Sequence, residues 1–190
     1  MVRSYQLSNV TQAYLNAYYS ILNTMIRRMT SVQLTPSISD NFIQQMIPHH
    51  LAAIEMSKNI LKYTTNLEVQ SIATNIISAQ TKSISNMLAI QSKCRMLTNK
   101  DFEQSNYMRR FEKIAQTMFY EMGTAHVTNG VNANFVREMI PHHEGAVRMS
   151  NNALQFNICP ELKPILYTII TTQCEGIQQL KHLLKHLDNC

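Results

Sequence analysis

Two adjacent histidines occur twice in this chain, each time within the pentapeptide Met-Ile-Pro-His-His. The copies, Met46–His50 and Met139–His143, stand 93 positions apart. Their surroundings match too, because 12 of the 21 positions that begin at Asn41 and at Asn134 are identical without a gap. Imidazole nitrogens bind many transition metals, and thioether sulfurs bind soft ions such as Cu⁺. The repeated histidine and methionine set therefore predicts a binding site for a soft metal.

Helical spacing places both histidines of a copy on the apolar side of one helix. At about 100° per residue, Met46, His49 and Met56 form one stripe, and His50 lies on the adjacent apolar stripe. The second copy repeats this pattern. Two further methionine pairs, each one helical turn apart, match between the repeats and could complete the sites. The predicted ligands are Met25, Met29, Met46, His49, His50, Met56, Met118, Met122, Met139, His142, His143 and Met149.

Copper, as Cu⁺, is the metal that this donor set favours. Zinc sites in proteins prefer Cys, His and carboxylate ligands. A di-iron bundle requires several Glu residues and a Glu-x-x-His pair, but Met46 and Met139 stand three residues before the first histidine of each copy. Glu138 and Glu144 have no acidic counterparts in the first repeat, which carries Gln45 and Leu51.

Gln80 and Gln173 occupy matching positions in otherwise apolar stripes, so each buried amide needs a hydrogen-bond partner. We expect each to orient a histidine of its own repeat from the second shell. Alternatively, each could bond to the carbonyl that Pro48 or Pro141 leaves without its helical partner.

A structural role for the histidines is the main alternative to metal binding. A buried histidine commonly serves as a hydrogen-bonded core residue, and methionine commonly fills gaps in a core. In that case the chain would be a structural or interaction protein without metal. The sequence favours a non-enzymatic role, because no activated nucleophile, carboxylate pair or phosphate loop accompanies the histidines.

A separate group, His182, His186 and Cys190, is spaced i, i+4, i+8 near the C-terminus. One helix face could present all three to Zn²⁺ or Cu⁺. The first repeat has no equivalent, and a frayed, solvated terminus is the interpretation that we favour for this group.

Apolar residues at helical spacing fill the chain, and no segment alternates with period two, so we predict an all-α bundle of about six helices. The expected helices span about Leu7–Met29, Ser39–Leu61, Leu67–Leu97, Asn106–Met122, Asn132–Leu154 and Pro160–Leu187. Ser39-Asp40 offers N-cap chemistry for the second. We expect a single domain, residues 1–190, of two pseudo-symmetric repeats, 1–97 and 101–190, because the 93-residue offset persists over most of each half.

Composition limits the function classes. The net charge of +5 is scattered without a basic stripe, so no nucleic-acid partner is expected. No apolar run approaches the length of a membrane span, and the N-terminus has no secretory h-region. Without a signal, the four cysteines are expected to be reduced thiols in a cytoplasmic protein, although a bridge between Cys159 and Cys174 stays open. The sequence does not predict an oligomeric state.

The combined motif resembles the domain-of-unknown-function 305 family. The pattern is F-x-x-x-M-I-P-H-H-x-x-A-[IV]-x-M followed by I-I-x-x-Q-x-x-x-I. It occurs here at Phe42–Met56 with Ile76–Ile84, and at Phe135–Met149 with Ile169–Ile177. The resemblance implies a ferritin-like bundle of two similar repeats. Many relatives are bacterial and secreted, and some resemble periplasmic copper-binding proteins rich in Met and His. One departure is that the acidic residue often found three positions after the glutamine is Ser83 or Gly176 here.

Overall fold

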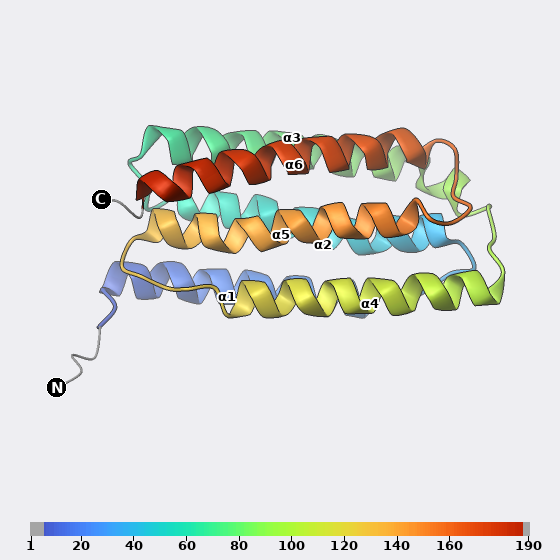
Figure 1. Ribbon diagram of the computed structural model, residues 1–190, viewed down its shortest axis with the longest axis horizontal. Helices are drawn as coiled ribbons and strands as arrows, with labels where there is room; N and C mark the ends of the chain where they lie inside the picture. The colour runs from blue at the N-terminus through green and yellow to red at the C-terminus, as the bar shows by residue number, and fades with distance from the viewer. Residues whose placement is uncertain (1–5, 188–190) are drawn as a thin grey trace.

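Six α-helices make up the part of the chain that the computed structural model describes, residues 6–187 (Figure 1). They are α1 (Asn9–Thr30), α2 (Ile38–Ile60), α3 (Leu67–Cys94), α4 (Asp101–Gly123), α5 (Val131–Ala153) and α6 (Leu162–Leu187). No strand occurs between residues 6 and 187, so the all-α prediction is confirmed. None of the helices in this range is long and apolar enough to cross a bilayer.

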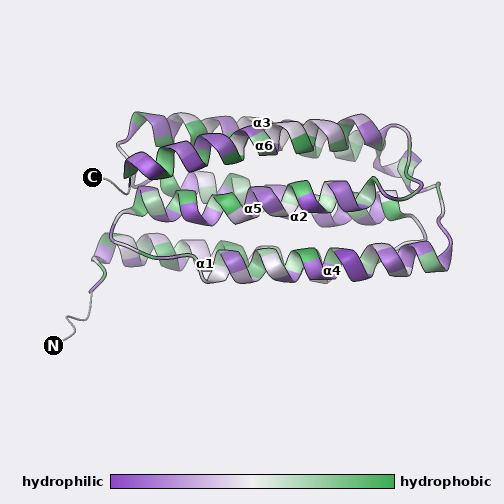
Figure 2. Ribbon diagram, in the orientation of Figure 1, coloured by the Kyte–Doolittle hydropathy of each residue, from purple (hydrophilic) through white to green (hydrophobic). Residues whose placement is uncertain are grey.

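The helices form three layers of two (Figure 1). The pair α2 and α5 is the middle layer, α3 and α6 lie on one side of it, and α1 and α4 lie on the other. Hydrophobic and hydrophilic residues alternate along the ribbons, as amphipathic helices require (Figure 2). The middle layer is covered on both sides, and therefore α2 and α5 contain most of the buried polar residues between residues 6 and 187.

The sequence repeat is also a repeat of contacts. Asn41 bridges the turn before α2 by bonding to the backbone N–H and C=O of Thr35, and Asn134 does the same to Thr128 before α5. Each of these partners lies 93 positions from its counterpart. The two histidine helices therefore enter the middle layer through the same local structure.

At α2 and α4 the capping contacts differ from what the sequence pattern predicts. The N-cap of α2 is Ser37, whose hydroxyl accepts from the N–H of Asp40, so Ser39 and Asp40 lie inside the helix. Helix α4 starts at Asp101, five residues before the predicted start, because the Glu103 carboxylate accepts from the backbone N–H of Lys100 and caps the first turn. The residues of that turn are too polar for apolar periodicity to reveal it.

A disulfide joins Cys94, at the end of α3, to Cys159, just before α6. The expectation that the cysteines are reduced thiols is therefore wrong for these two, and the bridge considered between Cys159 and Cys174 is not formed. Cys174 is free and exposed. Sequence spacing did not reveal the pair. The two cysteines are 65 residues apart, and only the packing of α3 beside α6 brings the end of one helix to the start of the other.

Removal of this disulfide should destabilise the bundle. A crosslink that closes a loop of 65 residues restricts the unfolded chain, and its loss should lower the free energy of unfolding by about 4 kcal/mol. Urea unfolding of Cys94→Ser measures the loss, and Cys174→Ser, at an exposed free thiol, is the matched control and should unfold like the parent protein. Alkylation of both Cys94 and Cys159 in the native, non-reduced protein would show that the bridge does not form.

Candidate metal centre

All four histidines of the two pentapeptides lie at the centre of the bundle, on the middle-layer helices α2 and α5. His49, His50 and His142 have no exposed surface, and His143 is 3% exposed. The prediction that both histidines of each copy point into the core is therefore confirmed. Both helices continue through Pro48 and Pro141, which stand one residue before the histidine pairs.

The first histidines of the two pairs meet across the interface of α2 and α5. Their rings are stacked, with centroids 3.7 Å apart. The Nε2 of His49 lies 3.1 Å from the carbonyl oxygen of His142, and the Nε2 of His142 lies 3.1 Å from the carbonyl oxygen of His49. A carbonyl can only accept a hydrogen bond, so both Nε2 atoms carry the proton. Each Nδ1 is therefore an unprotonated nitrogen with a free lone pair.

The second histidines point to the outer layer of α3 and α6, and there the two repeats differ. His50 Nε2 is 2.9 Å from the hydroxyl of Ser83 on α3. The residue in the equivalent position on α6 is Gly176, which has no side chain to offer, and no other side chain of residues 6–187 hydrogen-bonds to the ring of His143. A Cβ added to Gly176 would lie 2.8 Å from Cδ2 of His143, so the ring occupies the space that a side chain would need.

Burial keeps the four imidazoles neutral. Burial lowers the pKa of His50 and of His143 to about 3, with smaller contributions from neighbouring imidazoles. It lowers the pKa of His142 to about 4, against a backbone hydrogen bond with His49 that raises it. The pKa of His49 is lowered well below its ordinary value by burial and then by the other three rings. Unprotonated imidazole is the form that binds metals.

The Nδ1 atoms of all four histidines are buried and have no hydrogen-bond partner. An unpaired buried polar atom costs about 1–3 kcal/mol, so four on two neighbouring helices need an explanation. A metal ion would provide one.

The ring nitrogens do not converge as a preformed triad, however. Within residues 6–187, three ligand atoms of Cys, His, Asp or Glu lie within 4.8 Å of one another at one place only, formed by Cys94, Cys159 and Glu161. The sulfurs of the two cysteines there form the disulfide. Buried thioethers on the same helices are further candidate donors to an ion at the histidines.

The eight predicted methionine ligands are all buried, with exposed fractions of 0–1%: Met25, Met29, Met46, Met56, Met118, Met122, Met139 and Met149. Met46, Met56, Met139 and Met149 share α2 and α5 with the histidines. The other four come from α1 and α4, on the opposite side of the middle layer from Ser83 and Gly176. Of these, Met118 packs on α5 beside the histidine pair, because its Sδ fills the space where Gly145 has no Cβ.

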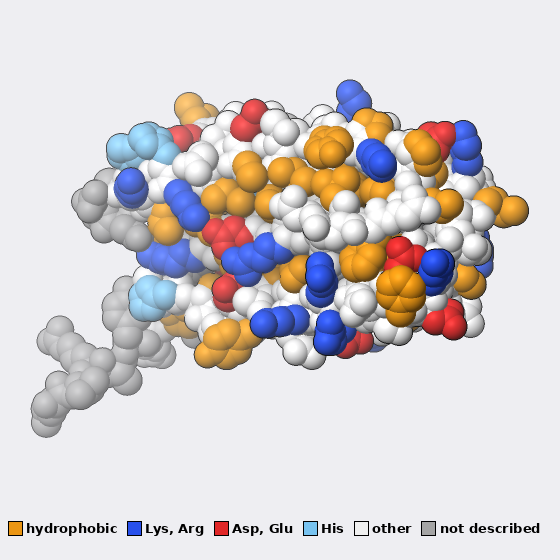
Figure 3. Space-filling model, turned by 45° about the vertical axis from the view of Figure 1, so that its right-hand side comes forward, with side chains coloured by type: hydrophobic (Ala, Val, Ile, Leu, Met, Phe, Trp, Pro, Cys, Tyr) orange, Lys and Arg blue, Asp and Glu red, His pale blue; other side chains and the backbone are white. Residues whose placement is uncertain are grey.

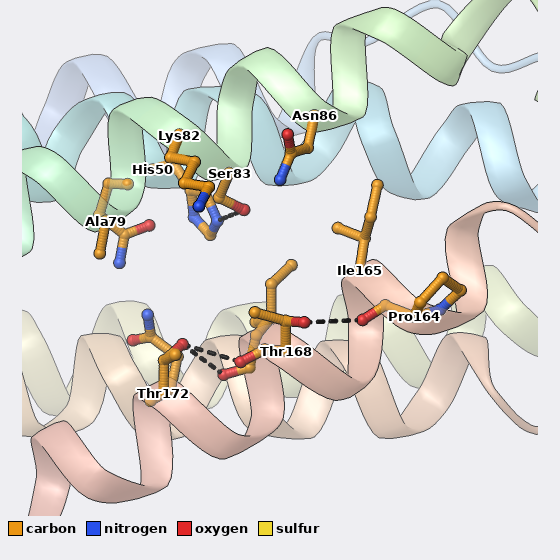
Figure 4. A pocket seen from close by; sticks show the side chains of 12 residues that line it. His50, Ala79, Lys82, Ser83, Asn86, Pro164, Ile165, Thr168 and Thr172 are labelled. Carbon is orange, nitrogen blue, oxygen red and sulfur yellow. Dashed lines mark hydrogen bonds between the residues drawn. The ribbon is translucent and has the colours of Figure 1, made fainter.

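A groove between α3 and α6 leads to the second histidines. One hollow of about 400 Å³ is lined by His50, Ser83 and Lys82 from one side and by Thr168 and Thr172 from α6 (Figure 4). A neighbouring hollow of about 170 Å³ is lined by His143 and Gly176. The outer layer therefore leaves both rings within reach of a small molecule or ion that enters between these two helices.

Gln80 and Gln173 line both hollows, but neither hydrogen-bonds to a histidine or to a backbone carbonyl. Their side-chain oxygens are buried without a partner. The predicted histidine-orienting hydrogen bond is therefore not formed, because Ser83 takes that place at His50 and the ring of His143 abuts the backbone of Gly176. The amides face the groove instead.

Sequence reasoning missed a buried polar pair near the histidines. Tyr14 of α1 donates a short hydrogen bond to Glu138 of α5, and the equivalent pair is Tyr107 donating to Gln45 over 2.8 Å. Burial raises the pKa of Glu138 to about 8, and the Tyr14 hydrogen bond opposes that rise. The spacing carried a signal, since Glu138 stands four residues before His142 and so shares its helix face.

Comparison with known proteins identifies the family. The profile of DUF305, described as a domain of unknown function, matches residues 39–184, and this chain belongs to that family. A crystal structure of a DUF305 fragment from Deinococcus radiodurans has the same fold, with a TM-score of 0.58 at 23% identity over 78% of this chain and 96% of that one.

Structures of CopM are also similar. Its Ag-bound form, obtained by soaking, matches with a TM-score of 0.57 at 27% identity over 82% of this chain and 98% of CopM. Its Cu(II)-bound form matches with a TM-score of 0.57 at 27% identity over 82% of this chain and 99% of CopM. Among curated proteins, no sequence matches this chain.

The buried histidines make stability depend on pH in the metal-free protein. Their folded-state pKa values lie below the ordinary value of 6.5, so their contribution is full above pH 6.5 and is lost as the pH falls toward 3. Each histidine contributes a slope of up to about 1.4 kcal/mol per pH unit in that window. Urea unfolding at a series of pH values measures the slope. A free energy of unfolding that stays constant from pH 6.5 to pH 4.5 would contradict the prediction.

Glu138 should act in the opposite sense in the same titration. Its folded-state pKa is raised from 4.5 to about 8, so its contribution is full below pH 4.5 and is lost as the pH rises to 8. Stability should therefore peak near pH 6.5. Glu138→Gln, which copies Gln45 of the other repeat, should abolish the decline between pH 6.5 and pH 8 and serves as the control.

Substitution of Gly176 tests the close approach of His143. Gly176→Ala would place its Cβ 2.8 Å from Cδ2 and 3.1 Å from Nε2 of that ring, so the ring must move, at a cost of about 1–3 kcal/mol. Gly123→Ala is the control, because no heavy atom lies within 4 Å of the added Cβ there. Thermal unfolding compares them. Equal melting temperatures for the two variants would show that the His143 ring does not occupy this space.

Proposed function

We propose that this chain is a non-enzymatic copper-binding protein that holds Cu⁺, or another soft transition-metal ion, at the histidines and methionines of the middle layer. Its role would be storage, sequestration or metal tolerance. The observation that carries the proposal is the set of four buried histidine Nδ1 atoms without hydrogen-bond partners, of which those of His49 and His142 are unprotonated. A metal ion requires free imidazole lone pairs, and histidines that serve only packing would be expected to have their buried nitrogens paired.

The surroundings suit a soft ion. Buried methionines on the same two helices supply thioethers, and imidazole with thioether is a donor set for Cu⁺. Methionine has three rotatable side-chain bonds, so its sulfur can turn toward an ion without movement of the helix. The nearest buried carboxylate, Glu138, has its pKa raised to about 8, so it is mostly protonated at pH 7 and adds little attraction for hard cations.

The CopM structures support copper as the proposed metal. They contain Ag and Cu(II), and they share the fold with this chain over most of both proteins. Silver and copper in their +1 states prefer the same soft donors. The choice of Cu⁺ for this chain rests on its own Met and His set.

The compartment is a further part of the proposal. The sequence expectation was a cytoplasmic protein, but a disulfide such as Cys94–Cys159 persists mainly in oxidising environments. We therefore favour an oxidising compartment as the place where this protein works.

A structural role has its own support and is the second candidate. The reciprocal Nε2–carbonyl bonds of His49 and His142 tie α2 to α5 without any metal. In this case the histidines would stabilise the bundle, and their loss would leave metal affinity unchanged.

Competition for Cu⁺ against a coloured chelator distinguishes metal binding at the histidines from a purely structural role. His49→Ala with His142→Ala should lower the affinity for Cu⁺ by at least about tenfold, because two imidazole donors are lost. Met46→Leu with Met139→Leu removes two thioethers at similar volume and should weaken binding of Cu⁺ more than of Zn²⁺. His126→Ala, at an exposed loop histidine, is the control.

The titration is read together with folding. Circular dichroism first establishes that each variant is folded at the assay temperature. A folded His49→Ala/His142→Ala protein that binds Cu⁺ with the stoichiometry and affinity of the parent would overturn copper binding at these residues and leave the structural role.

A further inference from the structure

Two exposed histidines lie close together far from the central four. His182 and His186 stand one turn apart near the end of α6, which continues to Leu187. The expected frayed terminus is therefore not observed at these two residues, and Cys190, the third member of the group, lies outside the described residues. Figure 3 shows the exposed histidines in pale blue at one end of the molecule.

The two rings present nitrogens to each other at a distance that suits a shared ion. Their Nε2 atoms are 3.2 Å apart, and the ring centroids are 4.7 Å apart. Two nitrogens bound to one ion at about 2.0–2.1 Å, with an angle between 90° and 109°, are separated by about 2.9–3.4 Å. The observed distance falls within that range, so the two nitrogens are spaced for one shared ion.

The surroundings permit a cation. The C-terminal end of a helix carries a partial negative charge, and both histidines lie in the last two turns of α6. Lys181, next to His182, is paired with Glu144 of α5 over 3.0 Å, which offsets its charge. Lys185 is the remaining cation between the two histidines in the sequence. It is exposed, so its charge is screened by water.

A hydrogen bond between the two rings does not by itself account for the pairing. At this exposed position water competes for both nitrogens, so a net gain from such a bond is small. The fixed helical spacing, in contrast, favours chelation, because the second imidazole binds an ion already held by the first.

We propose that His182 and His186 form a surface site for a borderline divalent ion of the Zn²⁺, Ni²⁺ and Cu²⁺ class, with water in the remaining coordination positions. This site is separate from the buried histidines and does not depend on soft-metal binding there. It lies on α6, one of the two helices that line the groove above His50 and His143.

Calorimetric titration of the full chain with Zn²⁺ tests the proposal, because Zn²⁺ has no redox chemistry to confuse the signal. Free thiols are alkylated beforehand so that cysteine does not bind the metal. His182→Ala and His186→Ala should each weaken one Zn²⁺ site by roughly tenfold or more, since each removes the chelate. The double variant should bind Zn²⁺ at this site no more tightly than either single one. His126→Ala, which removes a solitary exposed histidine, should leave that site intact.

Two results would overturn the proposal. One is a parent protein whose Zn²⁺ isotherm is the same as that of His182→Ala. The other is a loss of Zn²⁺ affinity in His126→Ala as large as that in His186→Ala, which would mean that any surface histidine binds Zn²⁺ equally. Because both residues are exposed, the variants should keep the melting temperature of the parent, and a measured melting curve verifies this. The buried site is assayed independently with Cu⁺, so failure of one site leaves the result for the other readable.

Discussion

The stacked rings of His49 and His142 are the contact around which the bundle is organised. They lie where α2 crosses α5, and each donates to the backbone of the other helix. This reciprocal pair joins the two repeats in the middle layer, which is covered on one side by α3 and α6 and on the other by α1 and α4. It constrains how α2 and α5 can slide, because a shift of one turn would separate two buried donors from their acceptors. The outer layers are then placed against a middle layer whose register is already set.

The same contact has a chemical consequence. A ring that donates through Nε2 keeps the proton there and leaves Nδ1 as a buried acceptor without a partner. Burial lowers the pKa of every one of these rings, so protonation cannot relieve the unpaired lone pairs near neutral pH. The structural bond and the proposed metal site are therefore compatible, because they use different nitrogens of one ring.

The repeats are similar in backbone and unequal in chemistry. Ser83 bonds to His50, whereas Gly176 leaves His143 with no such partner. Tyr107 meets the neutral amide of Gln45, whereas Tyr14 meets the acid of Glu138. The matching sequences of the two halves account for the shared helices, and the differences Ser83/Gly176 and Gln45/Glu138 make the halves chemically unequal. An ion bound at His50 would thus meet different neighbours from one bound at His143.

Much of this was readable from the sequence alone. Apolar periodicity of 3.6 residues determined six helices, the pentapeptide repeat determined that both halves are alike, and the helical angle determined that all four histidines face inward. These are local properties, because they depend on residues within a few turns of one another. The start of α4 escaped because its cap is a polar contact of Glu103 and not part of the apolar pattern.

Only the tertiary structure decided which inward-facing groups meet. Periodicity tells that a side chain points to the core, but it does not say which helix lies opposite. His49 could have faced Gln80, yet it stacks on His142 from the other repeat. The spacing of Cys94 and Cys159 matches no known motif. They pair because packing places the end of α3 beside the start of α6. The buried glutamines were predicted from their position, whereas their lack of partners depends on the groove between α3 and α6, which exists only once six helices are packed.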